Sequence, residues 1–394
     1  MSEKKDTGCF SRRKALCLLA GAPSLLSPAM AMAGRPPERR GYPGKFGSDA
    51  AHDTDAASLK WFQNAKFGLF MHYGLYSQLG RGEWVMLRNK VPLAQYEKLK
   101  DSFYPDGFDA DHIANIAVDA GMKYVNLTSK HHEGFCLFRT RQTTYCTTES
   151  PLRRDLVEEL AAACSKRRLG LFLYYSAALD WHHPYFPDPS AGFEYYRPTY
   201  PKKPAQYLWR KDADTRIYVE YVRHQLRELL TQYGPLAGIW FDPIMGYYAR
   251  PDLFPMEDIY RMIRELQPGC LVSFKQGATG TEDFAAPERH PGEVGSYASI
   301  SPAHREDARK VALKAWDRNR SKPMELCNTL QRTQWGYNRS DDGKHRGPDE
   351  VMALLQAAGS AKANLLLNTG LLPDGSIPAE DANTLRAVGK RRGA

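Results

Sequence analysis

Long apolar runs and closely spaced cysteines are what this sequence lacks. Beyond the first 33 residues no stretch of about 18 apolar residues occurs, so we expect no membrane-spanning helix in the mature chain. None of the seven cysteines forms a C-x-x-C pair, which argues against a zinc or thioredoxin-like motif. No G-x-G-x-x-G follows a strand-like segment, which argues against dinucleotide binding. Five cysteines lie beyond residue 33 and are expected to be buried free thiols: Cys136, Cys146, Cys164, Cys270 and Cys327.

A run of lysines and arginines interleaved with aromatic residues is also missing. The net charge is +9, and the first 33 residues hold five Lys/Arg and two Asp/Glu, so about +6 remains for the rest. Charge of this size, spread along the chain, indicates a mildly basic surface and no nucleic-acid interface. With 42% hydrophobic and 25% charged residues, the chain has enough apolar material for a large globular core.

The N-terminus has the pattern of an export signal. Basic residues at 4, 5 and 12–14 precede an apolar run over 15–26, and Ala31-Met32-Ala33 offers a cleavage site. Ser11-Arg12-Arg13-Lys14 resembles a twin-arginine motif, with a Sec signal that contains Arg-Arg as the alternative. We therefore expect a twin-arginine signal peptide over 1–33, a Pro-, Gly- and Arg-rich linker over 34–55, and a periplasmic or secreted protein.

Short apolar runs of strand length recur along the remaining chain, at 67–70, 124–127, 171–174, 238–241, 271–274 and 364–367. Continuous apolar strands are typical of a parallel sheet that is covered on both faces. Amphipathic segments at 155–166, 215–232, 256–266 and 351–362 alternate with them and are expected to be helices. The fold class is therefore α/β.

The residues that follow these strands favour a (β/α)8 TIM-like barrel, in a single catalytic domain over 56–385. Polar and aromatic side chains come at strand ends: His72, His131, Tyr174, Asp242 and Lys275. Barrel enzymes build their sites there, from several strands at once. A doubly wound sheet, the alternative architecture, would concentrate the site near one switch point.

Three groups of residues are candidates for chemistry. Asp242 follows an apolar strand and precedes a proline, where a carboxylate can be a nucleophile, a base, a metal ligand or a turn residue. The adjacent His131 and His132 lack the i, i+4 spacing of a metal-binding pair and suit hydrogen bonds to sugar hydroxyls. Three carboxylates follow each other closely later in the chain: Glu282, Asp283 and Glu288. From composition alone, these are also typical of a solvated acidic loop.

Several of these segments resemble the α-L-fucosidases of glycoside hydrolase family 29. Residues 61–77 read WFQNAKFGLFMHYGLYS and are followed by Gly-Glu-Trp at 82–84. Further matching motifs come in the same order at 123–137, 154–157, 174–181, 239–242, 335–338 and 364–368. The resemblance covers about residues 58–380 and implies a barrel fold and fucosidase activity.

The resemblance also implies roles for single residues. Asp242 matches the nucleophile of the family, and Glu288, at the end of Asp-Phe-x-x-Pro-Glu, matches its acid/base. Glu288 must be protonated to act as an acid, so a raised pKa is expected for it. The residues that match the sugar-binding positions are His72, Glu83, Trp84, His131, His132, Tyr174, Trp240, Lys275 and Trp335. No metal or organic cofactor is implied.

The sequence departs from the family pattern in three places. His72-Tyr73-Gly74 replaces His-Trp-Gly, and Lys275 stands where many members have arginine. Because arginine and lysine differ in donor geometry, we expect altered hydroxyl selectivity. The sequence ends soon after residue 378 without the C-terminal β-sandwich of many members, so a second subunit in a homo-oligomer is expected to shield the barrel instead.

The leading functional prediction is an exported retaining exo-α-L-fucosidase that acts on fucosylated oligosaccharides or glycans. One alternative is a glycosidase for another 6-deoxy or galacto-configured sugar, because of Lys275. A non-catalytic carbohydrate-binding barrel is a second alternative. A metal-dependent hydrolase that uses His131, His132, His182 and His183 is a third.

Overall fold

The computed structural model describes residues 56–289 and 297–393 of the chain. The expected signal peptide at 1–33 and linker at 34–55 lie outside these described residues. Among the described helices, none combines the length and the apolar character that crossing a membrane requires.

A parallel seven-stranded sheet with the order β5-β4-β3-β2-β1-β7-β6 forms the centre of the fold. Its strands are β1 (Phe67–His72), β2 (Tyr124–Lys130), β3 (Gly170–Ser176), β4 (Gly238–Asp242), β5 (Leu271–Phe274), β6 (Glu325–Thr329) and β7 (Asn364–Gly370). Every residue of every strand is buried. This confirms the sequence-based expectation of a parallel sheet with both faces covered.

The segment 283–289 lies between the two edge strands, β5 and β6. On the β5 side, the backbone N–H of Asp283 donates to Val272 O (2.8 Å) and that of Ala286 donates to Lys275 O (2.7 Å). On the β6 side, Glu288 forms a parallel bridge with Cys327. The segment therefore connects the edges of the sheet through backbone hydrogen bonds, although it is not a regular strand.

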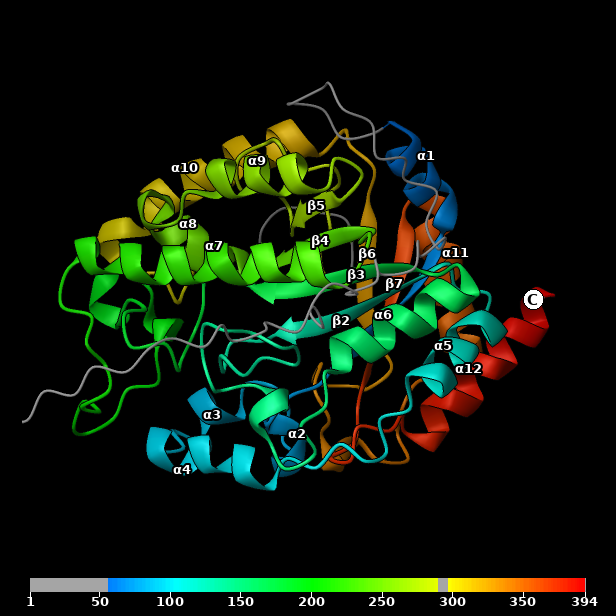
Figure 1. The fold of residues 1–394 in the computed structure, drawn as a ribbon. Helices are drawn as coiled ribbons and strands as arrows, with labels where there is room; N and C mark the ends of the chain where they lie inside the picture. The colour runs from blue at the N-terminus through cyan, green and yellow to red at the C-terminus, as the bar shows by residue number, and fades with distance from the viewer. Residues whose placement is uncertain (1–55, 290–296, 394) are drawn as a thin grey trace, which may run out of the picture. The chain divides into compact units, whose positions relative to one another are not determined.

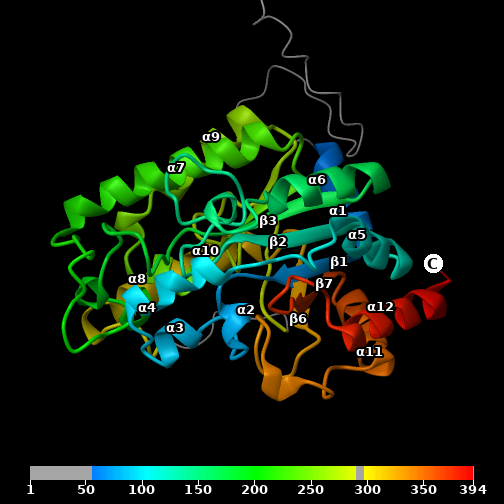
Figure 2. The ribbon, with the colours of Figure 1, turned by 60° about the horizontal axis from the view of Figure 1, so that its bottom comes forward.

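Helices cover the outside of the sheet (Figures 1 and 2). The longer ones are α1 (Ala56–Ala65), α5 (Ala110–Asp119), α6 (Leu156–Arg167), α7 (Thr215–Gln232), α9 (Met256–Leu266), α10 (Pro302–Asn319), α11 (Pro348–Ser360) and α12 (Ala379–Arg392). In Figure 1, α7 and α9 lie along one side and α5, α6 and α12 along the other. Asp109 and Asp155 cap the N-termini of α5 and α6 by accepting backbone N–H groups.

A second, smaller core fills the space enclosed by the strands. Phe70, Tyr124, Phe172 and Trp240 point inward, while their neighbours in each strand face the surrounding helices. Helix α1 closes the N-terminal end, because the Phe62 ring lies 4.2 Å from Phe284 and 5.8 Å from Phe172, between ring centroids. Because every second residue of a strand points inward, His72, Tyr174 and Asp242 also point inward, at the opposite, C-terminal end.

The structure confirms the six expected strand runs and the four expected helices, with α6 beginning one residue after its cap. It adds β6, which the apolar pattern did not indicate. The described sheet has seven strands where a (β/α)8 barrel has eight. All five described cysteines are free and buried, as expected.

Candidate active site

A cavity of about 700 Å³ opens at the C-terminal ends of the strands. All eleven sequence-predicted side chains line it, from the strands and from the segments that follow them: His72, Glu83, Trp84, His131, His132, Tyr174, Trp240, Asp242, Lys275, Glu288 and Trp335. Residues that are up to 263 positions apart in the sequence therefore meet around one space. A cavity of this size, where aromatic and polar side chains converge, is typical of a small-ligand site.

Asp242, the last residue of β4, lies at the bottom of this cavity. Its Oδ2 accepts a hydrogen bond from the Tyr174 hydroxyl (2.8 Å) and lies 3.6 Å from His132 Nε2. Its Oδ1 lies 3.4 Å from Lys275 Nζ. Burial raises the pKa of the Asp242 carboxyl to about 6, although the positive charge of Lys275 acts in the opposite direction.

Lys275 stands between two carboxylates. Besides Asp242, its ammonium group contacts Oε1 of Glu288 and lies over the Trp240 ring, 4.8 Å from the centroid. The backbone of Lys275 is left-handed, with φ 51°, which is uncommon for a long side chain. Non-glycine residues retained in this region occur often at functional sites, where the surrounding structure holds them.

Glu288 differs from the sequence-based expectation in its proton affinity. Burial raises the pKa of Glu288, but the positive charge of Lys275 outweighs this effect and lowers the pKa below its ordinary range. Its side chain is 47% exposed toward the cavity mouth. In this arrangement the proton is therefore held on Asp242 more readily than on Glu288, because the ammonium group is closer to Glu288.

Three neutral histidines surround the carboxylates. His72 Nδ1 pairs with Asn368 Oδ1 (2.7 Å), and His132 Nδ1 pairs with Ser176 Oγ (2.8 Å). His131 Nδ1 is buried and has no hydrogen-bond partner. Burial lowers the pKa of His72 to about 3 and lowers those of the other two well below the ordinary histidine value. Neutral imidazoles of this kind can donate and accept hydrogen bonds to hydroxyl groups.

Glu83 and the aromatic residues complete the wall. Glu83 Oε2 accepts the backbone N–H groups of Trp335 (3.0 Å) and Gly336 (2.8 Å), so it anchors the loop that carries the Trp335 ring. That ring lies 5.6 Å from His72 and Trp84 lies 5.0 Å from His132, between centroids. The arrangement combines hydroxyl-binding groups with apolar faces, which suits a sugar.

Comparison with known proteins agrees with this geometry. The family model for alpha-L-fucosidase matches residues 41–391. The chain belongs to the α-L-fucosidase family. This is glycoside hydrolase family 29, as the sequence motifs indicated.

Relatives of the α-L-fucosidase family share about a quarter to a third of their residues with this chain. Plasma alpha-L-fucosidase of Rattus norvegicus is 28% identical over 84% of this chain and 67% of its own length. Alpha-L-fucosidase isoenzyme 1 from Paenibacillus thiaminolyticus superimposes with a TM-score of 0.68 at 32% identity, over 86% of this chain and 75% of that one. Alpha-L-fucosidase AlfC from Lactobacillus casei, solved with α-L-fucose product, has a TM-score of 0.67 at 29% identity, over 85% and 98%. The chain spans about two thirds of the length of its mammalian plasma relative.

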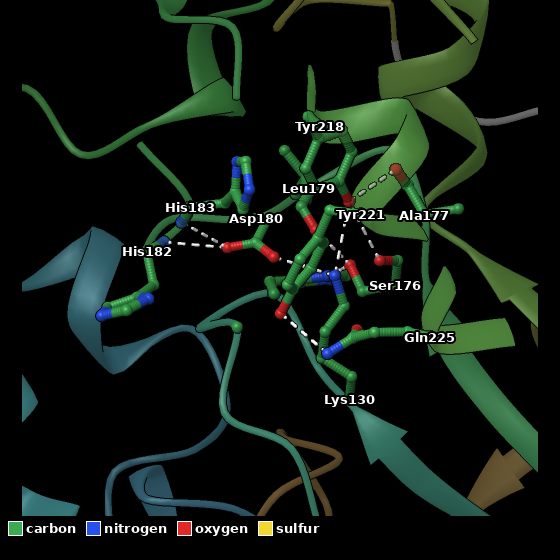
Figure 3. A network of polar contacts seen from close by, with 12 residues as sticks. Lys130, Ser176, Ala177, Leu179, Asp180, His182, His183, Tyr218, Tyr221 and Gln225 are labelled. Carbon is green, nitrogen blue, oxygen red and sulfur yellow. Dashed lines mark hydrogen bonds and ion pairs between the residues drawn. The ribbon is translucent and has the colours of Figure 1, made fainter. Parts of the chain in front are cut away.

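The fucosidase-family site also has a buried ion pair that the sequence analysis did not predict (Figure 3). It holds the backbone at His182 and His183. Lys130 Nζ lies 2.8 Å from Asp180 Oδ2, and both side chains are at most 1% exposed. Asp180 Oδ1 accepts the backbone N–H groups of His182 (3.0 Å) and His183 (2.7 Å). The pair connects the end of β2, just before His131, with the chain after β3. Its signal in the sequence was a lysine at the end of a buried strand, next to two histidines.

The other sequence candidates lie elsewhere. Glu282 is buried and accepts the Tyr260 hydroxyl (2.9 Å), and Asp283 accepts the Val272 N–H (2.7 Å), so both hold the fold together outside the cavity. His182 Nε2 pairs with Glu97 (3.0 Å). The histidines of the metal-hydrolase alternative therefore do not converge on one point within the described chain. A different group there, Asp342, His345 and Glu380, has ligand atoms close enough for a metal ion.

Proposed function

We propose that this protein is a retaining exo-α-L-fucosidase that works by double displacement, with Asp242 as nucleophile and Glu288 as acid/base. The observation that carries the proposal is the shared contact with Lys275. Because one Nζ atom lies 3.4 Å from an Asp242 oxygen and contacts a Glu288 oxygen, these oxygens are no farther apart than about 6.5 Å. Retaining enzymes need about 5–5.5 Å between the carboxyl groups, and inverting enzymes need about 6.5–9.5 Å.

In the first step, an Asp242 oxygen attacks the anomeric carbon and the bond to the leaving oxygen breaks. Glu288 gives that oxygen its proton, and a glycosyl–enzyme ester results. In the second step, Glu288 removes a proton from water, which attacks the same carbon and releases the sugar and the Asp242 carboxylate. Tyr174 and His132 bind the nucleophile and keep its attacking oxygen oriented.

The proton must move for this mechanism to begin. Asp242 and Glu288 raise the pKa of Lys275, which stays protonated, so the proton needed for catalysis is divided between the two coupled carboxylates. In the unliganded arrangement, Lys275 lies against Glu288 and keeps it ionised. A sugar that takes the Lys275 ammonium group as a hydrogen-bond donor draws it away from Glu288, and the Glu288 carboxyl then accepts the proton.

The cavity supports L-fucose as the sugar. Its histidines and carboxylates can hydrogen-bond to hydroxyl groups, and Trp240, Trp335 and Phe70 give an apolar surface that suits a C6 methyl group. Lys275 in place of the arginine of many family members favours, as a second candidate, another 6-deoxy or galacto-configured sugar. The presence of both carboxylates on one ammonium group argues against a carbohydrate-binding barrel without turnover.

We further propose that the segment 283–289 takes the place of the eighth strand of a (β/α)8 barrel. Its hydrogen bonds to β5 and to β6 support this, and they place Glu288 at the cavity rim.

The N-terminal pattern supports export by the twin-arginine route, with periplasmic or secreted localisation. Replacing Arg12 and Arg13 by lysine should retain the protein in the cytoplasm, and an unchanged periplasmic yield would contradict this route.

One experiment tests the central proposal. A panel of nitrophenyl glycosides should show hydrolysis of the α-L-fucoside above all others, and proton NMR should show the α-anomer of fucose as the first product. A first product with the β-anomeric configuration would exclude retention. Turnover of a different deoxy or galacto-configured glycoside with little turnover of the fucoside would move the assignment to that sugar.

A further inference from the structure

The cavity is larger than a single fucose residue needs. Pockets of roughly 300–1,000 Å³ hold drug-sized ligands, and this one has about 700 Å³, whereas a deoxyhexose is much smaller than such ligands. The sugar-binding groups His72, Trp240 and Asp242 are buried at its inner end. The outer part is therefore left for the group that the fucose is attached to, the aglycone.

Arg88 is one of the cations that line this outer part. It ends the short helix α3 (Val85–Arg88), its side chain is exposed, and its Nη1 donates to Gln334 Oε1 (3.0 Å), which also lines the cavity. No carboxylate among residues 56–289 and 297–393 lies within ion-pair distance of its guanidinium group. Most of its donors are thus available to a ligand.

Arg289 is the second cation, directly after Glu288. Its backbone N–H donates to Cys327 O (2.8 Å), and its φ of 63° places it, like Lys275, in the left-handed region. Two cationic residues that line the same cavity thus have a backbone conformation that costs free energy for a side chain of this type. In the described parts of the chain, no ion pair is formed by Arg289 either.

No carboxylate in the described part of the cavity forms an ion pair with either arginine, and only longer-range attraction links Arg88 with Glu83 and Arg289 with Glu288. Asp242 and Glu288 share Lys275, and Glu83 is buried against backbone N–H groups. The rim also has an aromatic ring, Tyr195, which is 37% exposed, and a buried amide, Gln276, whose Oε1 has no hydrogen-bond partner. The rim therefore has an apolar surface for a sugar ring, an acceptor for a hydroxyl group and two positive charges.

We propose that the outer part of the cavity binds an aglycone sugar that carries a negatively charged group, a sulfate ester or a carboxylate, through Arg88 and Arg289. Guanidinium groups bind such planar or tetrahedral oxyanions with two parallel hydrogen bonds. The inference rests on the proposed fucosidase activity and adds the class of aglycone to it.

Three disaccharides test it: fucosyl-galactose, the same compound with a sulfate ester on the primary hydroxyl of galactose, and fucosyl-galacturonic acid. At low ionic strength, we expect kcat/KM for at least one charged substrate to exceed that for the neutral one by about tenfold. High salt should reduce this ratio, because exposed charges are screened. The compound with the higher ratio identifies the preferred group, and a preference for either supports the inference.

The variants are chosen so that the ratio is the readout. Arg88→Gln with Arg289→Gln should bring the ratio of charged to neutral substrate close to one, while Arg216→Gln, an exposed arginine of α7 outside the cavity, should leave it as in the wild type. Equal kcat/KM for charged and neutral substrates in the wild type would overturn the inference alone. Failure to hydrolyse any fucoside, nitrophenyl α-L-fucoside included, would instead overturn the proposed function.

Discussion

Two lysine–carboxylate clusters differ in how completely their charges are matched. Outside the cavity, Lys130 has one carboxylate partner, Asp180, and both are at most 1% exposed. In the cavity, Lys275 has two carboxylate partners, of which Asp242 is 12% and Glu288 is 47% exposed. The first cluster is closed and the second is open.

The difference teaches what each cluster can do. Lys130 is also surrounded by the rings of Tyr175, Tyr218 and Tyr221, with centroids 4.6–5.3 Å from Nζ. With every charge compensated and no space for a ligand, this pair has one arrangement and serves to hold the loops after β2 and β3 (Figure 3). In the cavity cluster two carboxylates share the one lysine, so a proton can occupy either carboxylate. That property is needed for acid/base chemistry.

The largest effect is expected at Asp242, the proposed nucleophile. Asp242→Gly removes the attacking oxygen and should lower kcat at least about a thousandfold. Added azide should restore part of the rate by forming a glycosyl azide in the space left. Asp180→Asn is the matched change in the closed cluster and should lower the melting temperature more than Asp242→Gly does. Wild-type kcat in Asp242→Gly would contradict the assignment of the open cluster as catalytic.

The next effect concerns Glu288 and depends on the leaving group. An acid catalyst contributes about 10²–10⁴-fold, and most when the leaving group departs poorly without a proton. Glu288→Ala should therefore slow fucosyl oligosaccharides much more than nitrophenyl fucoside. Glu282→Ala is the control, because Glu282 lies outside the cavity and binds Tyr260. Equal slowing of both substrates by Glu288→Ala would remove the acid/base role.

A third prediction concerns the closed cluster. Lys130→Met leaves Asp180 buried without its cation, and breaking a buried pair in this way costs about 3–5 kcal/mol of the free energy of unfolding. Urea unfolding measures this loss. The double variant with Asp180→Asn should recover part of it, because no uncompensated charge remains. A single variant as stable as the wild type would show that the pair is not needed to hold the loops.

Local sequence patterns predicted the apolar strands and helices well, because each is determined by residues near in sequence. Strand β6 was not predicted, because its inward-pointing residue Glu325 is not apolar. Its carboxyl group accepts the Tyr124 hydroxyl and the Trp240 indole N–H (3.0 Å) across the interior. Burial raises the pKa of Glu325 to about 7. Partners 201 and 85 positions away leave no periodic signal.

The sequence predicted which residues line the site better than it predicted their pKa values. Motifs indicated which side chains meet in the cavity, and ends of parallel strands bring them together. The expected raised pKa of Glu288 was wrong for the unliganded structure, because it depends on where the Lys275 ammonium group lies. That position follows from a left-handed backbone at Lys275 and from the segment 283–289, and neither has a local sequence signature.

The last and smallest prediction compares the same substitution at the two lysines. Asp242 must be ionised to attack, so kcat/KM should fall as the pH falls through about 6, the pKa of this carboxyl in the wild type. The Lys275 charge lowers that pKa, so Lys275→Met should raise it and move the acidic limb of the profile to higher pH, by about one pH unit. Lys275→Arg should restore the limb, because the charge is kept. Lys130→Met, measured where it is still folded, should leave the limb near pH 6, because its lysine is matched to Asp180 and does not contact Asp242. If the limb moved equally in both methionine variants, the two clusters would be one electrostatic unit, and the distinction between a closed structural pair and an open catalytic one would not hold.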